Sequence, residues 1–389
     1  MTTETTPRIR LTKLELKGFK TFRELVFEPH ALNVIIGANG VGKSNFISFF
    51  RLMSWAMASS GNLQVEIARG GGASRLLHDG PQVTPQIEAG LTFETENGTN
   101  EYAARLDYAA GDTLVFASEQ FRFSSGHRRT KAPWIPIDGG RRESGLISLG
   151  DLGNKTAKSI RFLIQRCIVA QFHNTSPNSR MRAKWRVNDN RYLKEDGANL
   201  APVLLRLQSD EPYAYRRIAD TIRLIVPFFD DFELNPDHDS LLLAWREKGS
   251  DVVFDVSQAS DGMLRTMALV TLLGQPENDL PSILVLDEPE LGLHPYGISV
   301  IGGMIKRASK YIQVIIATQS VTLLDQFAPE DVVVVERPMQ QAAPGAPSPR
   351  PGREAIMRRL DPVSLATWLE EYSLGDLWLK NLLGARPNR

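Results

Sequence analysis

Alternation of apolar and polar residues marks the beginning of the chain as β structure. Residues 9–16 and 22–27 alternate as half-buried strands do. Between residues 86 and 123, short alternating segments are broken by an Asn-Gly pair at 97 and a Gly-Asp pair at 111. Because such dipeptides favour tight hairpin turns, this stretch predicts an antiparallel meander that forms a β subdomain.

Helical and strand patterns alternate in the rest of the chain. Helices are expected at 44–53, 156–171, 202–224 and from about residue 262. Strands are expected near Phe232, at 241–245 and at 252–256. Near the end, strand, helix, strand and strand follow one another at 283–286, 295–308, 312–317 and 332–335. This alternation is typical of a parallel sheet, so the pattern predicts an α/β fold.

The changes of pattern predict five segments. They are an N-terminal lobe with a β subdomain (1–124), a less regular and mainly helical insertion (125–200), a C-terminal lobe (201–339), a Pro-, Ala- and Gly-rich linker (340–352) and a tail with two short amphipathic helices (353–389).

Composition narrows the class of protein. The 389 residues are 42% hydrophobic and 23% charged, which are ordinary globular values, and 45 basic side chains balance 45 acidic ones. Cys167 is the single cysteine, so neither an internal disulfide nor a thiolate metal cluster is expected. The six histidines lack metal-site spacing. Without a signal sequence or an 18-residue apolar run, we expect a soluble cytoplasmic protein with no membrane partner.

A glycine-rich motif follows the short apolar run at 32–36. Residues 37–44 match G-x-x-x-x-G-K-[ST], in which backbone N–H groups cradle phosphates at a helix N-terminus. Lys43 would reach the β and γ phosphates of ATP, and the Ser44 hydroxyl would bind Mg²⁺. The residues expected to contact nucleotide here are Gly37, Asn39, Gly40, Gly42, Lys43, Ser44 and Asn45. The alternative is a glycine-rich turn without a ligand.

Carboxylates end a second apolar run, Ser282 to Leu286. Because the carboxyl ends of parallel strands meet at one sheet edge, Asp287 is expected to bind Mg²⁺ directly or through water. Glu288 is then positioned to act as a general base on the attacking water. The alternative is an acidic turn that caps the next helix.

The motif DEPELGLHP at 287–295 resembles that of ABC-class ATPases, in the branch that contains RecF, SMC heads and overcoming-lysogenization-defect proteins. The beginning of the chain (14–22 and 32–37) and residues 261–265 are also similar to these heads, and residues 360–384 resemble the ending of standalone bacterial ATPases of this branch. The resemblance implies an ABC-type head with a mixed central sheet, an antiparallel β subdomain and an ATP-dependent homodimer.

The resemblance also assigns roles to individual residues. Ser260, Asp261 and Gly262 would contact the γ-phosphate held by a second protomer, although an ordinary Asp-Gly turn that caps a helix is the simpler alternative. Gln319 occupies a switch position where the family often has histidine; it can orient water but cannot accept a proton, so hydrolysis is expected to be slow.

The sequence assigns four further residues less firmly. His294 lies where the family has a dimer-crossing loop, or simply begins a helix before Pro295. The sequence does not identify the Q-loop glutamine of the family, for which Gln165 and Gln171 are weak candidates. Lys20 would line the nucleotide, although an exposed surface lysine is favoured.

Basic residues concentrate in segment 122–191, where fifteen Lys or Arg face four acids. With Trp134 and Trp185 available for stacking, this segment predicts weakly sequence-specific DNA binding. The resemblance implies that such binding would serve a DNA transaction such as repair or phage defence. The alternative is a regulatory ATPase that drives a protein partner without binding DNA. Because only about seventy residues follow Gln319, any nuclease activity is expected to come from a partner or effector protein.

Overall fold

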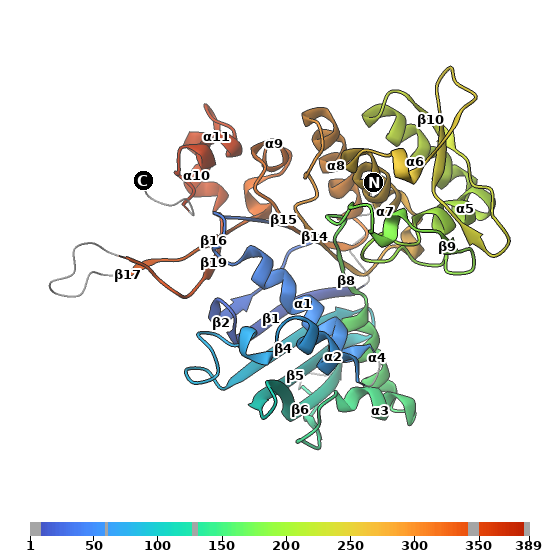
Figure 1. Ribbon diagram of the computed structural model, residues 1–389. Helices are drawn as coiled ribbons and strands as arrows, with labels where there is room; N and C mark the ends of the chain where they lie inside the picture. The colour runs from blue at the N-terminus through green and yellow to red at the C-terminus, as the bar shows by residue number, and fades with distance from the viewer. Residues whose placement is uncertain (1–8, 59–60, 127–130, 341–349, 385–389) are drawn as a thin grey trace.

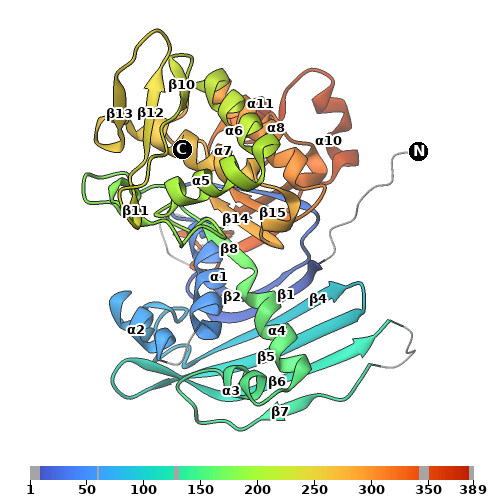
Figure 2. The ribbon, with the colours of Figure 1, turned by 90° about the vertical axis from the view of Figure 1, so that its right-hand side faces the viewer.

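Two six-stranded sheets, one antiparallel and one mostly parallel, form the framework of the chain (Figures 1 and 2). The computed structural model describes residues 9–58, 61–126, 131–340 and 350–384. The antiparallel sheet lies in one lobe, and the mostly parallel sheet lies in the other with a layer of helices on its far face.

The antiparallel sheet confirms the predicted β subdomain. Its strand order is β2-β1-β4-β5-β6-β7, formed by β1 (Ile9–Phe19), β2 (Phe22–Phe27), β4 (Gln86–Thr95), β5 (Gly98–Ala109), β6 (Thr113–Ser125) and β7 (Ile135–Ile137). Thr95 pairs with Gly98 and Ala109 pairs with Thr113, so the chain reverses at the two turns that the sequence predicts.

The second sheet has the order β19-β16-β3-β15-β14-β8, and every strand except β19 runs parallel. Its strands are β3 (Leu32–Ile36), β8 (Cys167–Ala170), β14 (Ile283–Asp287), β15 (Gln313–Ala317), β16 (Val332–Glu336) and β19 (Ile356–Arg359). Alternate side chains of β3 face opposite layers, because Val34 and Ile36 join one core cluster while Ile35 joins the other. Because β3, β14 and β15 run parallel, the loops that follow them emerge at the same edge of the sheet.

Helix α1 (Lys43–Met57) packs between the two sheets (Figure 2). Phe46 and Phe49 are fully buried and make edge-to-face contacts with aromatic rings of β1 and β2, with ring centroids 5.2–6.3 Å apart. Burying each such ring contributes about 2–3 kcal/mol to folding. The N-terminus of α1 is thereby held at the sheet edge where β3 ends.

The remaining elements cover the outer faces. The helices are α2 (Asn62–Arg69), α3 (Gly145–Asp151), α4 (Lys155–Gln165), α5 (Leu200–Asp210), α6 (Pro212–Ile225), α7 (Asp261–Gly274), α8 (Pro295–Ala308), α9 (Val321–Leu324), α10 (Pro362–Leu369) and α11 (Leu374–Leu379). The short strands are β9 (Trp185–Arg186), β10 (Phe229–Phe232), β11 (Ser240–Leu241), β12 (Ala244–Glu247), β13 (Val253–Asp255), β17 (Met339–Gln340) and β18 (Arg350–Pro351). No helix of the described residues has the length and apolarity needed to cross a membrane.

Two helices are shorter than the sequence predicts. The helix expected at 156–171 ends at Gln165, because Cys167–Ala170 pairs in parallel with β14 and becomes an edge strand of the second sheet. The helix expected at 202–224 is two helices, since Pro212 has no N–H for the preceding turn and begins a new helix at its first position.

The strand expected at 241–245 is also divided. Leu241 pairs with Trp185 of β9, whereas Trp245 pairs with Phe232 of β10, so β11 and β12 belong to different small sheets.

The tail adds a strand as well as its two expected helices. Strand β19 pairs antiparallel with β16, so residues after the predicted linker complete the second sheet. Of that linker, residues 341–349 lie outside the described residues. Segment 125–200 contributes to both lobes: α3 and α4 lie with the antiparallel sheet, while β8 belongs to the parallel one (Figure 2).

Candidate nucleotide site

The glycine-rich motif forms a turn from buried β3 into α1, as its pattern predicts. Lys43 begins the helix with 6% of its surface exposed, and its Nζ donates to the carbonyls of Gly37 (2.6 Å) and Ala38 (3.1 Å). At Gly42, φ is 139° and a Cβ would lie 2.7 Å from the Thr21 hydroxyl, so only glycine fits this position. Ser44 and the turn residues Asn39 and Gly40 are exposed.

Side chains from other elements hold this turn in place. Arg337, after β16, donates to the carbonyls of Gly40 (2.9 Å) and Val41 (3.3 Å). Asn45 donates to the Thr21 hydroxyl (3.2 Å) in the β1–β2 turn. Lys20 in that same turn is half-buried and donates to Ser48 of α1 (2.7 Å), so the favoured prediction of an exposed lysine is wrong.

Acidic side chains lie close enough to affect Lys43. Burial lowers the pKa of its ammonium group, and the negative charges of Glu288, Asp287 and Glu290 oppose this effect. The structure therefore brings the glycine-rich turn and the carboxylates that follow β14 to one sheet edge.

Asp287 ends β14 with 8% of its surface exposed. Burial raises the pKa of its carboxyl group, and the Gln171 side chain donates to its Oδ2 at 2.7 Å. The Ser44 hydroxyl and the Asp287 carboxylate are hard oxygen donors, which Mg²⁺ prefers. The residues present thus fit a nucleotide-bound Mg²⁺, although no group of three or more His, Cys, Asp or Glu among the described residues forms a protein-only metal site.

Glu288 has a strained backbone with φ 43°. Its N–H donates to the carbonyl of Ala317 on β15 at 2.8 Å, which fixes the residue one step beyond the parallel strands. The half-buried side chain accepts a hydrogen bond from Nε2 of Gln319 at 2.6 Å. The structure therefore brings together both residues that the sequence proposed for catalysis.

Glu290 organises the switch, a role that the sequence did not assign. It accepts hydrogen bonds from the Thr318 hydroxyl (2.6 Å) and the Gln319 N–H (3.1 Å), and burial raises the pKa of its carboxyl group. The available signal was the second glutamate of the motif DEPE, which follows Glu288 after Pro289. Glu290 thereby sets the direction in which Gln319 leaves β15.

The structure distinguishes the two glutamine candidates that flank β8. Gln171 follows the strand and contacts Asp287, whereas Gln165 precedes it and donates to the Met57 carbonyl of α1 at 2.7 Å. Nε2 of His173 lies 2.8 Å from the Asp287 carbonyl, a contact that the sequence did not predict. Of the two glutamine candidates, Gln171 therefore contacts the candidate metal ligand, whereas Gln165 contacts α1.

We expect Gln171→Ala to lower the ATP hydrolysis rate, or the affinity for Mg²⁺ in that reaction, by about 10- to 100-fold, because it removes a contact that orients a candidate ligand. The measurement is the Mg²⁺ dependence of ATP hydrolysis. Gln165→Ala is the matched control, since it also removes one side-chain hydrogen bond beside β8 but none at Asp287. Equal effects of the two substitutions on Mg²⁺ dependence would contradict the assignment.

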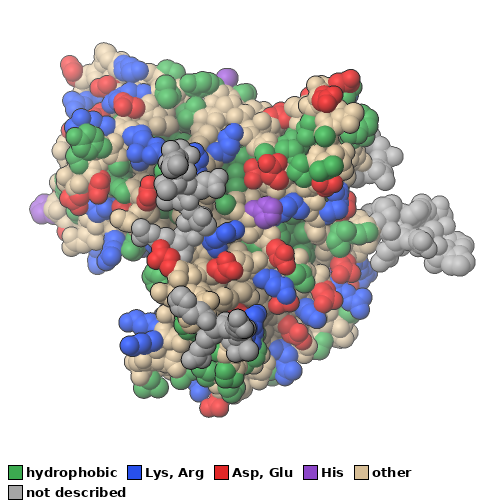
Figure 3. Space-filling view, turned by 180° about the vertical axis from the view of Figure 1, so that it is seen from behind, with side chains coloured by type: hydrophobic (Ala, Val, Ile, Leu, Met, Phe, Trp, Pro, Cys, Tyr) green, Lys and Arg blue, Asp and Glu red, His purple; other side chains and the backbone are tan. Residues whose placement is uncertain are grey.

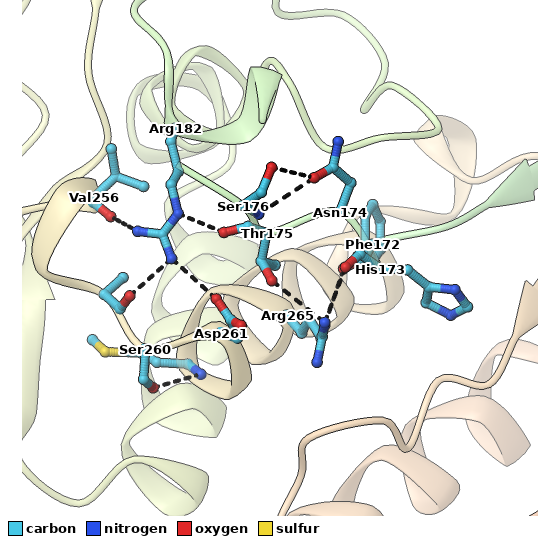
Figure 4. Close-up of polar contacts among 12 residues, drawn as sticks. Phe172, His173, Asn174, Thr175, Ser176, Arg182, Val256, Ser260, Asp261 and Arg265 are labelled. Atoms are coloured by element: carbon cyan, nitrogen blue, oxygen red, sulfur yellow. Dashed lines mark hydrogen bonds and ion pairs between the residues drawn. The ribbon is translucent and has the colours of Figure 1, made fainter. Parts of the chain in front are cut away.

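The residues proposed to meet a second protomer lie at the N-terminus of α7 (Figure 4). Ser260 caps the helix by accepting from the Met263 N–H (3.2 Å), and both Ser260 and Asp261 are exposed. Gly262 is required by packing, since a Cβ there would lie 2.4 Å from the Gly292 carbonyl. These residues therefore do cap a helix, as the simpler alternative states. The exposed N-terminus of that helix is still suited to an anion.

Two arginines connect this N-terminus to the loop after β8 (Figure 4). Arg182 pairs with Asp261 (3.2 Å) and donates to the Ala259 carbonyl (3.0 Å) and the Thr175 carbonyl (2.8 Å). Arg265 of α7 donates to the His173 carbonyl (2.9 Å) and weakly to the Leu291 carbonyl (3.4 Å). Arg265 thus joins α7 to the loop that touches Asp287.

His294 fits its simpler interpretation. It is exposed and caps α8, with its Nδ1 3.4 Å from the Tyr296 N–H. Leu291 and Tyr296 beside it are 41% and 54% exposed, so the loop between β14 and α8 presents apolar surface to solvent.

Many cations of segment 122–191 have acidic partners. Arg122 (2.7 Å) and Lys131 (3.0 Å) both pair with Glu101 of β5, and Lys184 pairs with Asp237 (2.6 Å). Burial opposes ionisation of Glu101, but these two cations lower its pKa. Arg128 and Arg129 lie outside the described residues. The local excess of positive charge in sequence is therefore partly neutralised in space.

The rings of the two tryptophans proposed for base stacking already contact arginine side chains. The Arg122 guanidinium lies 4.3 Å from the Trp134 ring centroid, and that of Arg180 lies 4.7 Å from the Trp185 ring centroid. The exposed cations of the segment that have no ion pair among the described residues are Arg142, Lys155, Lys158, Arg186 and Arg191.

A glycine-rich turn at the edge of a mostly parallel sheet, with an antiparallel lobe packed across α1, is the architecture of ABC-class heads. The chain has the fold of the ABC-class ATPase heads found in SMC proteins, as the resemblance implied. A family model described as "AAA domain, putative AbiEii toxin, Type IV TA system" matches residues 32–325, and the chain belongs to this family.

Solved structures of SMC heads share the fold. An SMC head bound to the C-terminal winged-helix domain of ScpA has a TM-score of 0.59 at 16% identity, covering 91% of this chain and 99% of that one. The Pyrococcus furiosus SMC head with an extended coiled coil, bound to the C-terminal domain of ScpA, has a TM-score of 0.57 at 17% identity, covering 93% and 99%. No curated protein matches the chain.

Proposed function

We propose that two copies of this ATPase close on two ATP molecules and that hydrolysis separates them. The observation that carries the proposal is the exposed N-terminus of α7, because the hydrogen bonds among described residues connect Ser260, Asp261 and Gly262 to no residue of 37–45 in the same chain. A helix N-terminus attracts anions, so this one is suited to a phosphate presented by another copy.

Each half-site would combine binding with proton transfer. Lys43 and the glycine-rich turn would hold the phosphates, while Ser44 and Asp287 would hold Mg²⁺, which neutralises phosphate charge when bound. Glu288 would accept the proton of the attacking water, and Gln319, which donates to Glu288, would orient that water. Because Gln319 cannot itself relay the proton, turnover should lie well below the typical value of about ten per second.

Molecular mass measured by light scattering tests the dimer directly. We expect a monomer without nucleotide and a dimer with ATP and Mg²⁺. An unchanged mass under both conditions contradicts the ATP-gated model.

The proposed switch has two candidate partners, DNA and another protein. The SMC head structures that share this fold contain a bound ScpA domain, which supports a protein partner for this chain. We propose a DNA transaction, such as repair or phage defence, with an effector protein supplying any nuclease activity. Arg186 and Arg191 are exposed and have no ion pair among the described residues, so they are free to contact phosphates.

A double substitution, Arg186→Glu with Arg191→Glu, is expected to weaken binding of short duplex DNA. Each lost phosphate contact should reduce the slope of log affinity against log salt by about 0.9. Lys306→Glu with Lys310→Glu is the matched control, because it reverses two exposed charges at the end of α8, outside segment 122–191, that have no ion pair among the described residues. DNA affinity that neither pair changes, or no binding at low salt, favours the protein-partner alternative.

A further inference from the structure

Helix α10 in the tail exposes an unusually apolar sequence. All of its eight residues except Ser364 and Thr367 are apolar, yet none is fully buried. A surface helix normally buries its apolar stripe and turns polar residues outward. Here Leu365 and Leu369 pack partly against the core, while Val363 and Trp368 on the outer sides are 84% and 48% exposed.

The exposed apolar surface extends past α10. Leu379 at the end of α11 is 48% exposed and Leu382 is 49% exposed. Figure 3 shows hydrophobic side chains gathered at the upper right of the rear face, where the tail lies, with acidic side chains beside them. Large apolar side chains that gather on the exposed surface of a folded domain are typical of an interaction site.

The helix pair is firmly anchored, so this surface is preorganised. On α11, Leu377 and Trp378 are buried in the core, and the Gly375 N–H donates to the Asp325 carboxylate after α9 at 2.7 Å. A Cβ at Gly375 would lie 2.3 Å from the Val321 side chain, which reflects the close approach of α11 to α9. A rigid surface loses little conformational entropy on binding.

Acidic side chains lie beside α10. Glu370 and Glu371 at its end are exposed and have no ion pair among the described residues, and Asp361 caps its N-terminus. Two cations lie nearby, since the Lys380 ammonium group is 3.7 Å from the Tyr372 ring centroid and Arg358 donates to the Leu383 carbonyl at 3.1 Å. Acidic side chains beside an apolar helix complement a basic amphipathic segment.

We propose that the outer surface of α10 and α11 (Val363, Trp368, Leu379 and Leu382, flanked by Glu370 and Glu371) docks an amphipathic helix of a partner protein with apolar anchors and flanking Lys or Arg. The tail lies beyond the residues matched by the family model. Binding here requires neither ATP nor the proposed dimer, so the two proposals fail independently.

The test uses a fluorescent probe at the surface of the full chain. Cys167 is buried and burial raises the pKa of its thiol to about 12, so a cysteine introduced by Val363→Cys is selectively labelled with an environment-sensitive dye. The titrant is a synthetic amphipathic Leu–Lys peptide of about 15 residues. A peptide of the same composition with scrambled order and one with Glu in place of Lys are the controls. Leu152→Cys, at an equally exposed apolar position (84%), is the control label.

We expect a saturable signal from the label at 363 with the basic amphipathic peptide alone and without nucleotide. Glu370→Lys combined with Glu371→Lys should weaken that binding about tenfold, because both charges of the acidic rim are reversed. Equal response to the scrambled or acidic peptide, an equal response at 152, or no saturation overturns the proposal. Self-association that Val363→Glu abolishes also overturns it, because the occupant would then be a second copy.

Discussion

Glu288→Gln is expected to bind ATP as wild type does, while its hydrolysis rate falls by at least about 100-fold. The substitution removes the candidate base at the end of β14 but leaves Lys43 and the glycine-rich turn intact. With hydrolysis blocked, the ATP-bound dimer should persist. Light scattering with ATP and Mg²⁺ then gives a stable dimeric mass, and single-turnover measurements give the loss of rate.

Glu277→Gln is the control for this substitution. It makes the same chemical change on the exposed turn before β14, where neither ATP hydrolysis nor mass should change. A Glu288→Gln variant that hydrolyses ATP at the wild-type rate would exclude Glu288 as the base. A variant that is inactive yet monomeric with ATP would instead contradict the dimer.

Lys43→Ala should raise the dissociation constant for ATP by at least about 100-fold, because a buried cation that would contact the phosphates is lost. The carbonyls of Gly37 and Ala38 also lose their hydrogen-bond donor, so the empty turn itself is less well held. Titration calorimetry measures the affinity, and circular dichroism verifies that the fold remains.

Lys20→Ala is the matched comparison, since Lys20 also contacts α1 but donates to Ser48 instead of the turn. If Lys20 does not line the nucleotide, this variant should retain ATP affinity. Unchanged affinity in Lys43→Ala would refute the assignment of the turn as a phosphate site.

The contacts around β8 also indicate how the two halves of the site are mechanically connected. Gln171 and His173 touch Asp287, and Arg265 joins the same loop to α7. A change at the candidate metal ligand therefore has a short, continuous path to the exposed N-terminus of α7. Arg182, although part of the basic segment, serves this connection, which is why the DNA test uses other residues.

Local sequence by itself determined the elements whose conformation depends on near neighbours. The glycines at 37, 40 and 42 adopt backbone geometry that few other residues allow. The short apolar run before them forms a buried strand, as its pattern predicts. The meander was equally predictable, because period-two alternation and glycine turns act within a hairpin. The carboxylates after β14 were also predictable, because they directly follow a short apolar run that forms a buried strand.

Only the tertiary structure decided which residues complete the site. Cys167–Ala170 continues a helical pattern in sequence, and its strand exists because β14, more than a hundred residues later, offers an edge to pair with. That pairing places Gln171, and not Gln165, at Asp287. Likewise, the charge of segment 122–191 depends on acids such as Glu101 and Asp237, which are distant in sequence. Propensity acts locally, whereas strand pairing and charge neutralisation act between segments that only folding brings together.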